Sequence, residues 1–214
     1  MITSSAEKLL LKNTKKTAGS LDSQLILPIG DPSKAYLRIL STQKNEQNEK
    51  DIIFITNCRN KYPKAFLTEF EATASQTSDW LSNYVSDDDS RILFMVDLPD
   101  GQTIGYMGLA FIDWEKKYGE ADAIVRGIPA PKYVMSASLG VLLKWAQERL
   151  GLKEVGVRVL SDNPALKFYK KCGFIENKRV PLSKKVEGGK IVWFENEKNM
   201  SPSRSLVYHH FERS

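Results

Sequence analysis

The chain has 214 residues, of which 42% are hydrophobic and 27% are charged, a balance typical of soluble globular proteins. No apolar run approaches the length of a membrane span, and residues 1–16 lack the apolar segment of a signal peptide, so neither a membrane protein nor a secreted protein is expected. The net charge of +5 is compatible with an anionic ligand, but Lys and Arg are interspersed with acids and form no basic block, which argues against nucleic-acid binding.

The N-terminal stretch to about Asp22 is polar and rich in lysine, with one apolar cluster at residues 9–11. We expect residues 1–22 to form a polar extension or a short docked helix. No internal repeat or low-complexity linker divides the rest of the chain, so residues 23–214 are expected to form a single domain.

Hydrophobic periodicity predicts the elements up to residue 126. A short apolar run closed by a Gly-Asp-Pro turn precedes a strand, two helices and three further strands. The second helix is expected to turn Trp80, Leu81 and Tyr84 inward. In chain order the predicted ranges are 24–29, 35–40, the helices 47–59 and 75–84, then 91–96, 103–112 and 119–126.

The stretch 154–174 carries the most informative pattern of the chain. Val155, Val157 and Val159 alternate with other residues as in a strand, which ends at the Ser-Asp-Asn-Pro sequence of residues 161–164. Such a sequence caps a helix, predicted here over 164–171 and ended by Gly173. An amphipathic helix over 135–150 precedes this stretch, and strands at 175–182, 190–194 and 206–210 follow it.

The spacing of Asn163, Ala165, Tyr169 and Gly173-Phe174 resembles the N-x-A-x-x-x-Y-x-x-x-G-F signature near the end of GNAT-type N-acetyltransferases. Residues 141–146 also resemble the helix that precedes this signature in that family. The resemblance implies an α+β or α/β fold, with a mixed, mostly antiparallel sheet that is flanked by helices and splayed at the acetyl-CoA site. It also implies transfer of an acetyl group from acetyl-CoA to a primary amine.

The resemblance places the coenzyme against three backbone segments: the strand end at 124–126, a helix N-terminus near 132–137, and the signature turn. Its pyrophosphate loop, Q/R-x-x-G-x-G/A, falls at 131–136 or, shifted by one, at 132–137, and neither register holds the first glycine. Loss of glycine could weaken binding, although N–H groups at 134–137 stay available. The assigned residues are Ile124, Val125, Arg126, Lys132, Tyr133, Val134, Met135, Ser136, Ala137, Asn163, Ala165 and Phe168.

Tyr169 occupies the general-acid position of the family, since a neutral phenol can protonate the departing thiolate. A packed core tyrosine explains the same position, just as helix capping explains Asn163. Glu120 and Asp122 lie two apart on the strand 119–126, so they should share one face with Ile124 and Arg126.

Glu120 is the first choice for the general base, with Asp122 beside it. The alternative is an exposed strand end whose acids pair with Lys116, Lys117 or Arg126. His209 and His210 are expected at the surface rather than at the reaction centre.

Three residues are predicted to bind the acceptor. Arg59 and Asn60, late in the first helix, resemble a subgroup of GNAT proteins that acetylate amino sugars on nucleotide carriers, although an arginine also suits a helix C-terminus. Trp114 is a candidate stacking surface for a sugar or a peptide.

Three functions stay open from the sequence. The first is acetylation of a small amine, such as an amino sugar or a nucleotide-linked amino sugar. The second is acetylation of a protein N-terminus or lysine, and the third is a non-catalytic module that binds acyl-CoA or a partner. We expect acetyl-CoA as cosubstrate, no metal, no nucleic-acid or membrane partner, and a homodimer as a candidate assembly. Cys58 and Cys172 are the only cysteines, which favours the reducing cytoplasm.

Overall fold

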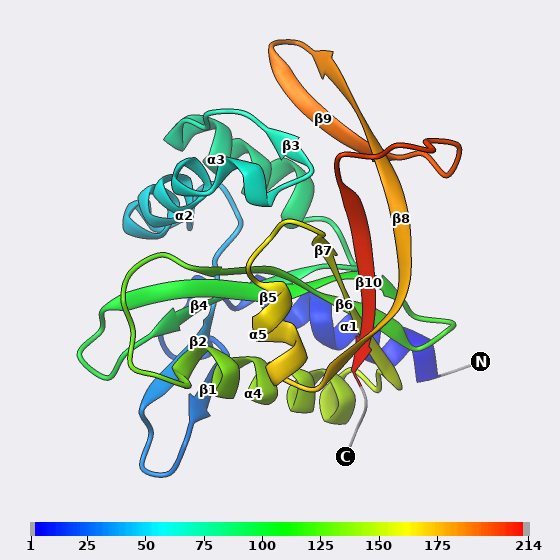
Figure 1. The fold of residues 1–214 in the computed structure, drawn as a ribbon. Helices are drawn as coiled ribbons and strands as arrows, with labels where there is room; N and C mark the ends of the chain where they lie inside the picture. The colour runs from blue at the N-terminus through cyan, green and yellow to red at the C-terminus, as the bar shows by residue number, and fades with distance from the viewer. Residues whose placement is uncertain (1–2, 212–214) are drawn as a thin grey trace. The chain divides into compact units, whose positions relative to one another are not determined.

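The computed structural model describes residues 3–211, and their contacts divide them into two compact units. The first unit comprises the chain up to residue 58 together with 73–155, and the second comprises 59–72 together with the chain from residue 156. The chain passes from one unit to the other within α2 (Glu49–Lys61), between residues 72 and 73, and near the start of β7 (Glu154–Leu160). Figure 1 labels the helices and strands of both units. The expected single domain over 23–214 stays a prediction.

The first unit is built on five antiparallel strands in the order β1-β2-β4-β5-β6. The four strands predicted within residues 35–126 are confirmed to within two residues at either end, because period-2 patterns bounded by turn residues mark strands clearly. The apolar run at 24–29, for which no strand was predicted, also contains one. The bounds of the five strands are β1 Ile26–Ile29, β2 Ala35–Ile39, β4 Ile92–Asp97, β5 Thr103–Asp113 and β6 Tyr118–Arg126.

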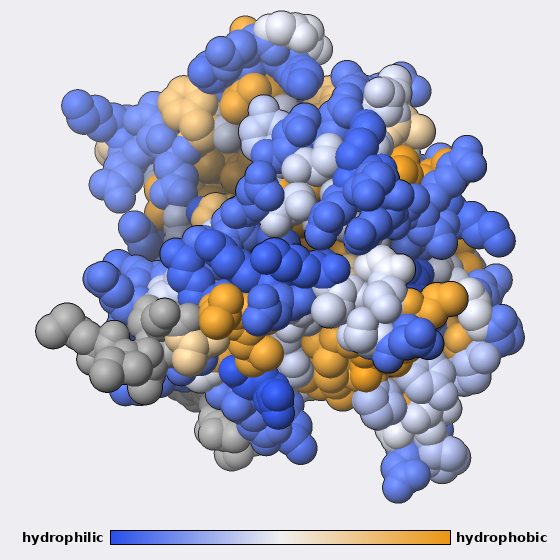
Figure 2. Space-filling model, turned by 180° about the vertical axis from the view of Figure 1, so that it is seen from behind, coloured by the Kyte–Doolittle hydropathy of each residue, from blue (hydrophilic) through white to orange (hydrophobic). Residues whose placement is uncertain are grey.

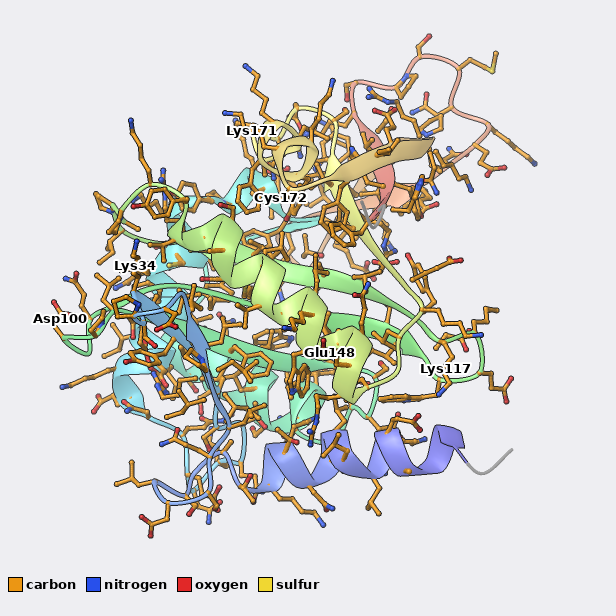
Figure 3. The ribbon with its side chains drawn as sticks, turned by 90° about the horizontal axis from the view of Figure 1, so that it is seen from below. Lys34, Asp100, Lys117, Glu148, Lys171 and Cys172 are labelled. Atoms are coloured by element: carbon orange, nitrogen blue, oxygen red, sulfur yellow. The ribbon has the colours of Figure 1, made fainter. Side chains whose placement is uncertain are left out.

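Helices cover both faces of this sheet. On one face lies α4 (Val134–Arg149) (Figure 3). The ring of its residue Trp145 packs edge-on against Phe94, with the centroids 5.5 Å apart. On the other face α2, α3 (Ala74–Trp80) and the π-helical turn η2 (Leu81–Val85) enclose a core that includes Ile55, Leu81 and Tyr106. The sheet is therefore buried on both sides.

The end of the second predicted helix differs from the expectation. The N–H of Ser86 donates to the Leu81 carbonyl at 2.9 Å, a π-type bond that spans five residues. This wider turn buries Leu81 and Val85 completely and leaves Tyr84 69% exposed. The prediction that Tyr84 faces inward was wrong, because a regular helical period does not anticipate a π turn.

The N-terminal stretch forms a docked helix, α1 (Thr3–Lys16). Lys8 and Lys12 contact the Asp89 carboxylate at 2.7 and 3.7 Å. Lys15 is buried and donates to the carbonyls of Val85 and Asp88. Burial lowers the pKa of Lys15 to about 8, an effect that the neighbouring aspartates oppose. Three lysines on successive turns thus hold α1 against the acidic loop that follows η2.

An ionic network fastens α2 to the same sheet. Arg38 of β2 donates two hydrogen bonds to the Asp51 carboxylate of α2, at 2.9 and 3.0 Å, and a third to Asp97 of β4 at 2.6 Å. The hydroxyl of Thr103 donates to the other oxygen of Asp97 at 2.6 Å. The side chains of Asp51 and Asp97 are 5% and 13% exposed, so the network is largely shielded from water.

The second unit holds five antiparallel strands in the order β7-β10-β8-β9-β3. The last strand of the chain, β10 (Ser205–Phe211), lies between β7 and β8 (Phe174–Glu187). The remaining elements are β9 Lys190–Glu195, the two-residue strand β3 Thr68–Glu69, the 3-10 turn η1 Pro63–Ala65 and the short helix α5 Leu166–Lys171. Leu160, Leu182, Trp193 and Leu206 form its core cluster.

Hydrophilic side chains dominate the face drawn in Figure 2, where hydrophobic residues occur in small groups. Within the described part of the chain, no helix has both the length and the apolar character needed to cross a membrane.

Candidate active site

Strand β6 contains a β-bulge next to the two predicted acids. Ala123 and Ile124 stand opposite a single residue of β5, Met107, and Ala123 has a φ of 54°, in the left-handed region. One residue is thus inserted into the ladder, which bends the strand and increases its twist. The pairs on either side of the bulge are Asp122–Gly108 and Val125–Tyr106.

The bulge changes which residues share a face. Glu120 and Asp122 lie opposite Ala110 and Gly108, two residues apart on β5, so they share one face as predicted. Arg126 lies opposite Gly105, which belongs to the other face of β5. The prediction that Arg126 continues the acidic face was wrong, because the inserted residue inverts the alternation; Ile124 lies within the bulge, outside the regular alternation.

Glu120 is 7% exposed, and its carboxylate accepts a hydrogen bond of 3.2 Å from the hydroxyl of Tyr118. Both lysines considered as alternative partners of Glu120 and Asp122 form ion pairs with other acids: Lys116 with Asp113 at 2.8 Å and Lys117 with Glu7 at 3.1 Å. A buried carboxylate beside a neutral phenol is a suitable environment for a general base. Sequence reasoning missed Tyr118, although its position two residues before Glu120 on the same strand places it on the same face.

The N-terminus of α4 shows how the glycine-poor loop is accommodated. Tyr133 is the N-cap residue and takes the left-handed conformation, with a φ of 65°. Val134 and Met135, which stand at the first-glycine position in the two registers, are helical and only 2% and 9% exposed. A Cβ atom on Gly105 would lie 3.1 Å from the terminal methyl of Met135, so this side chain packs against β5 and not over the helix end.

The N–H groups of the first helical turn are only partly used within the chain. The N–H of Ala137 donates to the Tyr133 carbonyl at 2.8 Å, as in a regular helix, and that of Val134 donates to Pro131 at 3.4 Å. Helix geometry leaves the N–H groups of Met135 and Ser136 directed out of the N-terminus. The loop can therefore present backbone donors to an anion without its glycines.

The signature residues of the second unit combine packing with capping. Tyr169 is 5% exposed, and its ring meets Phe168 and Phe174 edge-on at centroid distances of 5.3 and 5.8 Å. Asn163 caps the turn before α5, because its side-chain oxygen accepts a hydrogen bond of 2.9 Å from the N–H of Ala165. Both structural explanations are present, and the roles in acid catalysis and coenzyme binding stay predictions.

The predicted acceptor residues Arg59 and Asn60 shape the segment that they begin. The guanidinium of Arg59 lies 4.3 Å from the ring centres of both Phe66 and Phe70. The amide of Asn60 exchanges two hydrogen bonds with the backbone of Ala72, at 2.9 and 2.8 Å, which closes residues 60–72 into a loop. These contacts do not test acceptor binding.

Two further predicted side chains are buried. Trp114 is 8% exposed and its indole N–H donates to the Asp89 carbonyl at 3.0 Å, so its ring offers little surface for stacking. His209 is 6% exposed, contrary to the surface position expected for it, because β10 is enclosed by two neighbouring strands. Burial lowers its pKa. Over residues 3–211, no group of three or more His, Cys, Asp or Glu side chains is arranged to hold a metal ion.

Comparison with known proteins gives a consistent picture. Residues 47–175, more than half of the chain, match the family model described as acetyltransferase (GNAT) domain. No curated protein matches the chain.

Three solved structures illustrate the similarity of fold. A spermidine N-acetyltransferase from Vibrio cholerae in complex with CoA and spermine is 19% identical, with a TM-score of 0.60 over 83% of this chain and 95% of that one. The spermidine/spermine N-acetyltransferase SpeG from the same organism, in complex with manganese ions, is 20% identical, with a TM-score of 0.58 over 83% and 92%. A GCN5-related N-acetyltransferase from Brucella melitensis is 16% identical, with a TM-score of 0.62 over 88% and 78%.

Proposed function

Because the chain belongs to the GNAT acetyltransferase family, it is an acetyl-CoA-dependent N-acetyltransferase, and we propose that Glu120 is the base that activates a primary amine of a small molecule. The observation that carries this proposal is the position of Glu120. It is buried beside the Tyr118 hydroxyl on the strand that bulges immediately after Asp122.

The reaction needs three proton transfers. An amine is protonated at neutral pH, so Glu120 first takes a proton from the ammonium group, directly or through a water molecule. The neutral nitrogen then attacks the thioester carbonyl and becomes positively charged, so it releases a second proton, to water, as the intermediate collapses and the C–S bond breaks. Tyr169 donates its phenolic proton to the departing thiolate, for which a neutral phenol is suited.

For the coenzyme, we propose three backbone contacts. The N–H groups of Met135 and Ser136 at the start of α4 would receive the pyrophosphate, since the positive end of the helix dipole also favours an anion. The backbone of residues 124–126, beyond the bulge, would pair with the pantetheine arm together with Asn163. The buried side chains of Val134 and Met135 support this proposal, because they leave the helix end open to a phosphate.

Two classes of acceptor are candidates. An amino sugar or nucleotide-linked amino sugar follows from the resemblance of Arg59 and Asn60 to the corresponding subgroup. A polyamine is favoured by a different observation, because Glu120 and Asp122 present two carboxylates on one face, which suits an acceptor with more than one positive charge. The spermidine N-acetyltransferase from Vibrio cholerae, whose fold is similar to that of this chain, is a protein that acts on such an acceptor.

Calorimetric titration of the purified chain with acetyl-CoA and with free CoA is the first test. Saturable binding is expected. Absence of binding by a folded protein would show that the altered loop has lost the coenzyme and would favour the non-catalytic module. A panel of amines with detection of the released thiol then separates spermidine, amino sugars, nucleotide-linked amino sugars and peptides with free N-termini. Turnover confined to peptides would refute the small-molecule proposal.

Two further points complete the proposal. We place the enzyme in the cytoplasm, which agrees with both cysteines being free thiols. A homodimer stays a prediction that light scattering on the purified chain can test.

A further inference from the structure

Arg204, in the coil before β10, is the buried centre of a polar cluster in the second unit, at whose edge the Asp162 side chain is 51% exposed. Arg204 is 8% exposed and lies with its guanidinium 4.9 Å from the ring centre of Trp193. Its Nε and Nη2 atoms contact one carboxylate oxygen of Asp162, at 2.8 and 2.7 Å. Its Nη1 atom donates to Glu69 at 3.0 Å, and Nη2 also donates to the Lys64 carbonyl at 2.9 Å.

The same carboxylate of Glu69 is held from a second side. The indole N–H of Trp193 donates to Oε1 of Glu69 at 2.6 Å, the oxygen that also accepts from Arg204. The backbone N–H of Trp193 donates to the Leu67 carbonyl at 2.7 Å. The Arg204 cluster (Arg204, Asp162, Glu69 and Trp193) therefore joins three stretches of chain that are remote in sequence.

Two of these stretches carry residues assigned to different substrates. Asp162 immediately precedes Asn163, in the turn that leads into α5 and Tyr169 and that we assign to the coenzyme. Glu69 and the Lys64 carbonyl belong to segment 59–72, which begins with the predicted acceptor residues Arg59 and Asn60. Arg204 is thus a direct ionic link between the coenzyme turn and the acceptor segment.

We propose that Arg204 is a positioning residue that fixes the coenzyme turn relative to segment 59–72, so that binding of one substrate depends on the alignment of the other. The inference rests on the proposed function. An arginine suits this task because its planar guanidinium serves several acceptors in fixed directions, whereas a lysine ammonium is a point charge on a flexible stem. Displacement of a catalytic group by about 1 Å can lower turnover about 100-fold.

The first test uses three single variants, each assayed well below its melting temperature with acetyl-CoA and with the best amine of the panel. Asp162→Asn should raise KM for acetyl-CoA about tenfold, with a smaller effect on KM for the amine. Glu69→Gln should raise KM for the amine more than KM for acetyl-CoA. Arg204→Lys should raise both KM values and lower kcat. Equal KM values in all three variants and in the unaltered protein would overturn the proposal.

Arg204→Ala provides a second measurement. Low concentrations of guanidinium chloride should raise its kcat in a saturable manner, because the free ion can occupy the vacated position between the two carboxylates. Urea at the same concentrations is the control and should have no such effect. If guanidinium fails to restore the activity of Arg204→Ala, or lowers it further, Arg204 contributes to stability alone.

Arg179→Lys is the matched control. This arginine lies on β8 of the same unit, its side chain is 49% exposed, and it donates two hydrogen bonds of 3.0 Å to Glu176 of the same strand. Its variant should keep both KM values. Failure of the proposed function would appear separately, as an unaltered protein that acetylates no amine, whereas failure of this inference would leave that activity intact and Arg204 dispensable for it.

Discussion

The network around Arg38 gives a stability prediction that can be worked from the structure. Asp51→Asn keeps the shape of the side chain but removes its charge, and with it the strength of the two hydrogen bonds from Arg38 at 2.9 and 3.0 Å. Breaking a buried ion pair costs about 3–5 kcal/mol. Arg38 keeps its hydrogen bond of 2.6 Å to Asp97 in this variant, so we expect Asp51→Asn to lower the free energy of unfolding by about 3 kcal/mol, the lower end of that range.

Arg38→Met should lower the free energy of unfolding by more than Asp51→Asn does, by about 4–5 kcal/mol, because it leaves the two shielded carboxylates of Asp51 and Asp97 without their positively charged partner. For a chain of this length, a loss of about 3 kcal/mol corresponds to a fall of roughly 6–12 °C in melting temperature. Urea and thermal unfolding, followed by circular dichroism, measure both quantities.

The matched control is Glu148→Gln, which breaks the ion pair between Glu148 and Lys144 on the outer face of α4 (Figure 3). These side chains are 54% and 72% exposed and their charged atoms are 4.0 Å apart, so we expect a change below about 0.5 kcal/mol. Values for Asp51→Asn and Arg38→Met as small as that of the control would refute the view that this network fastens α2 to the sheet.

Four further predictions concern the site and the N-terminal helix. Tyr169→Phe should lower kcat while leaving the affinity for acetyl-CoA unchanged in calorimetry; equal turnover at all pH values would remove the acid role. Glu120→Gln should abolish the rise of kcat/KM with pH that a general base produces, and an unaltered pH profile would reject Glu120. Lys15 has its pKa lowered by burial from 10.5 to about 8, so between these values the unfolded chain binds more protons and the unfolding free energy should rise with pH. Lys15→Met should remove this rise, as seen by comparing urea unfolding of the two proteins across that range. Ala123→Gly should keep or raise the melting temperature, because glycine adopts a φ of 54° without strain, whereas Ala123→Val should lower it.

Much of the fold could be predicted because local patterns mark its elements. Periodicity and turn residues are enough to predict the strand at 154–160, the amphipathic helix at 134–149 and the short helix α5. The start of α5 differs from the prediction, since it lies at Leu166 instead of residue 164 and the N-cap residue, Ala165, makes no side-chain cap bond. The position of β10 between β7 and β8 could not be predicted, since it depends on pairing between strands far apart in the sequence. The two-residue strand β3 is too short to leave a pattern.

The site was less predictable than the fold for the same reason. The shared face of Glu120 and Asp122 follows from their spacing in the sequence. The bulge after them consists of one inserted residue, and no residue type in the sequence marks its position. Trp114 was expected to be a stacking surface from its type and loop position, and only the folded chain shows that it is buried. Arg204 stands in a coil with no motif around it, so its contacts to Asp162 and Glu69 could not be anticipated.

The bulge in β6 also constrains how the length of this strand can change in evolution. Removal of one residue between Asp122 and Val125 would restore a regular ladder and leave Val125 and Arg126 opposite Tyr106 and Gly105, on the faces that they occupy now, although the bend that the bulge gives the strand would be lost. Removal of both residues would shift the strand end by one position along β5 and move Val125 and Arg126 to the opposite faces. Among relatives of this chain, loss of one residue from the interval between the acidic pair and the end of the strand should therefore be tolerated far better than loss of two.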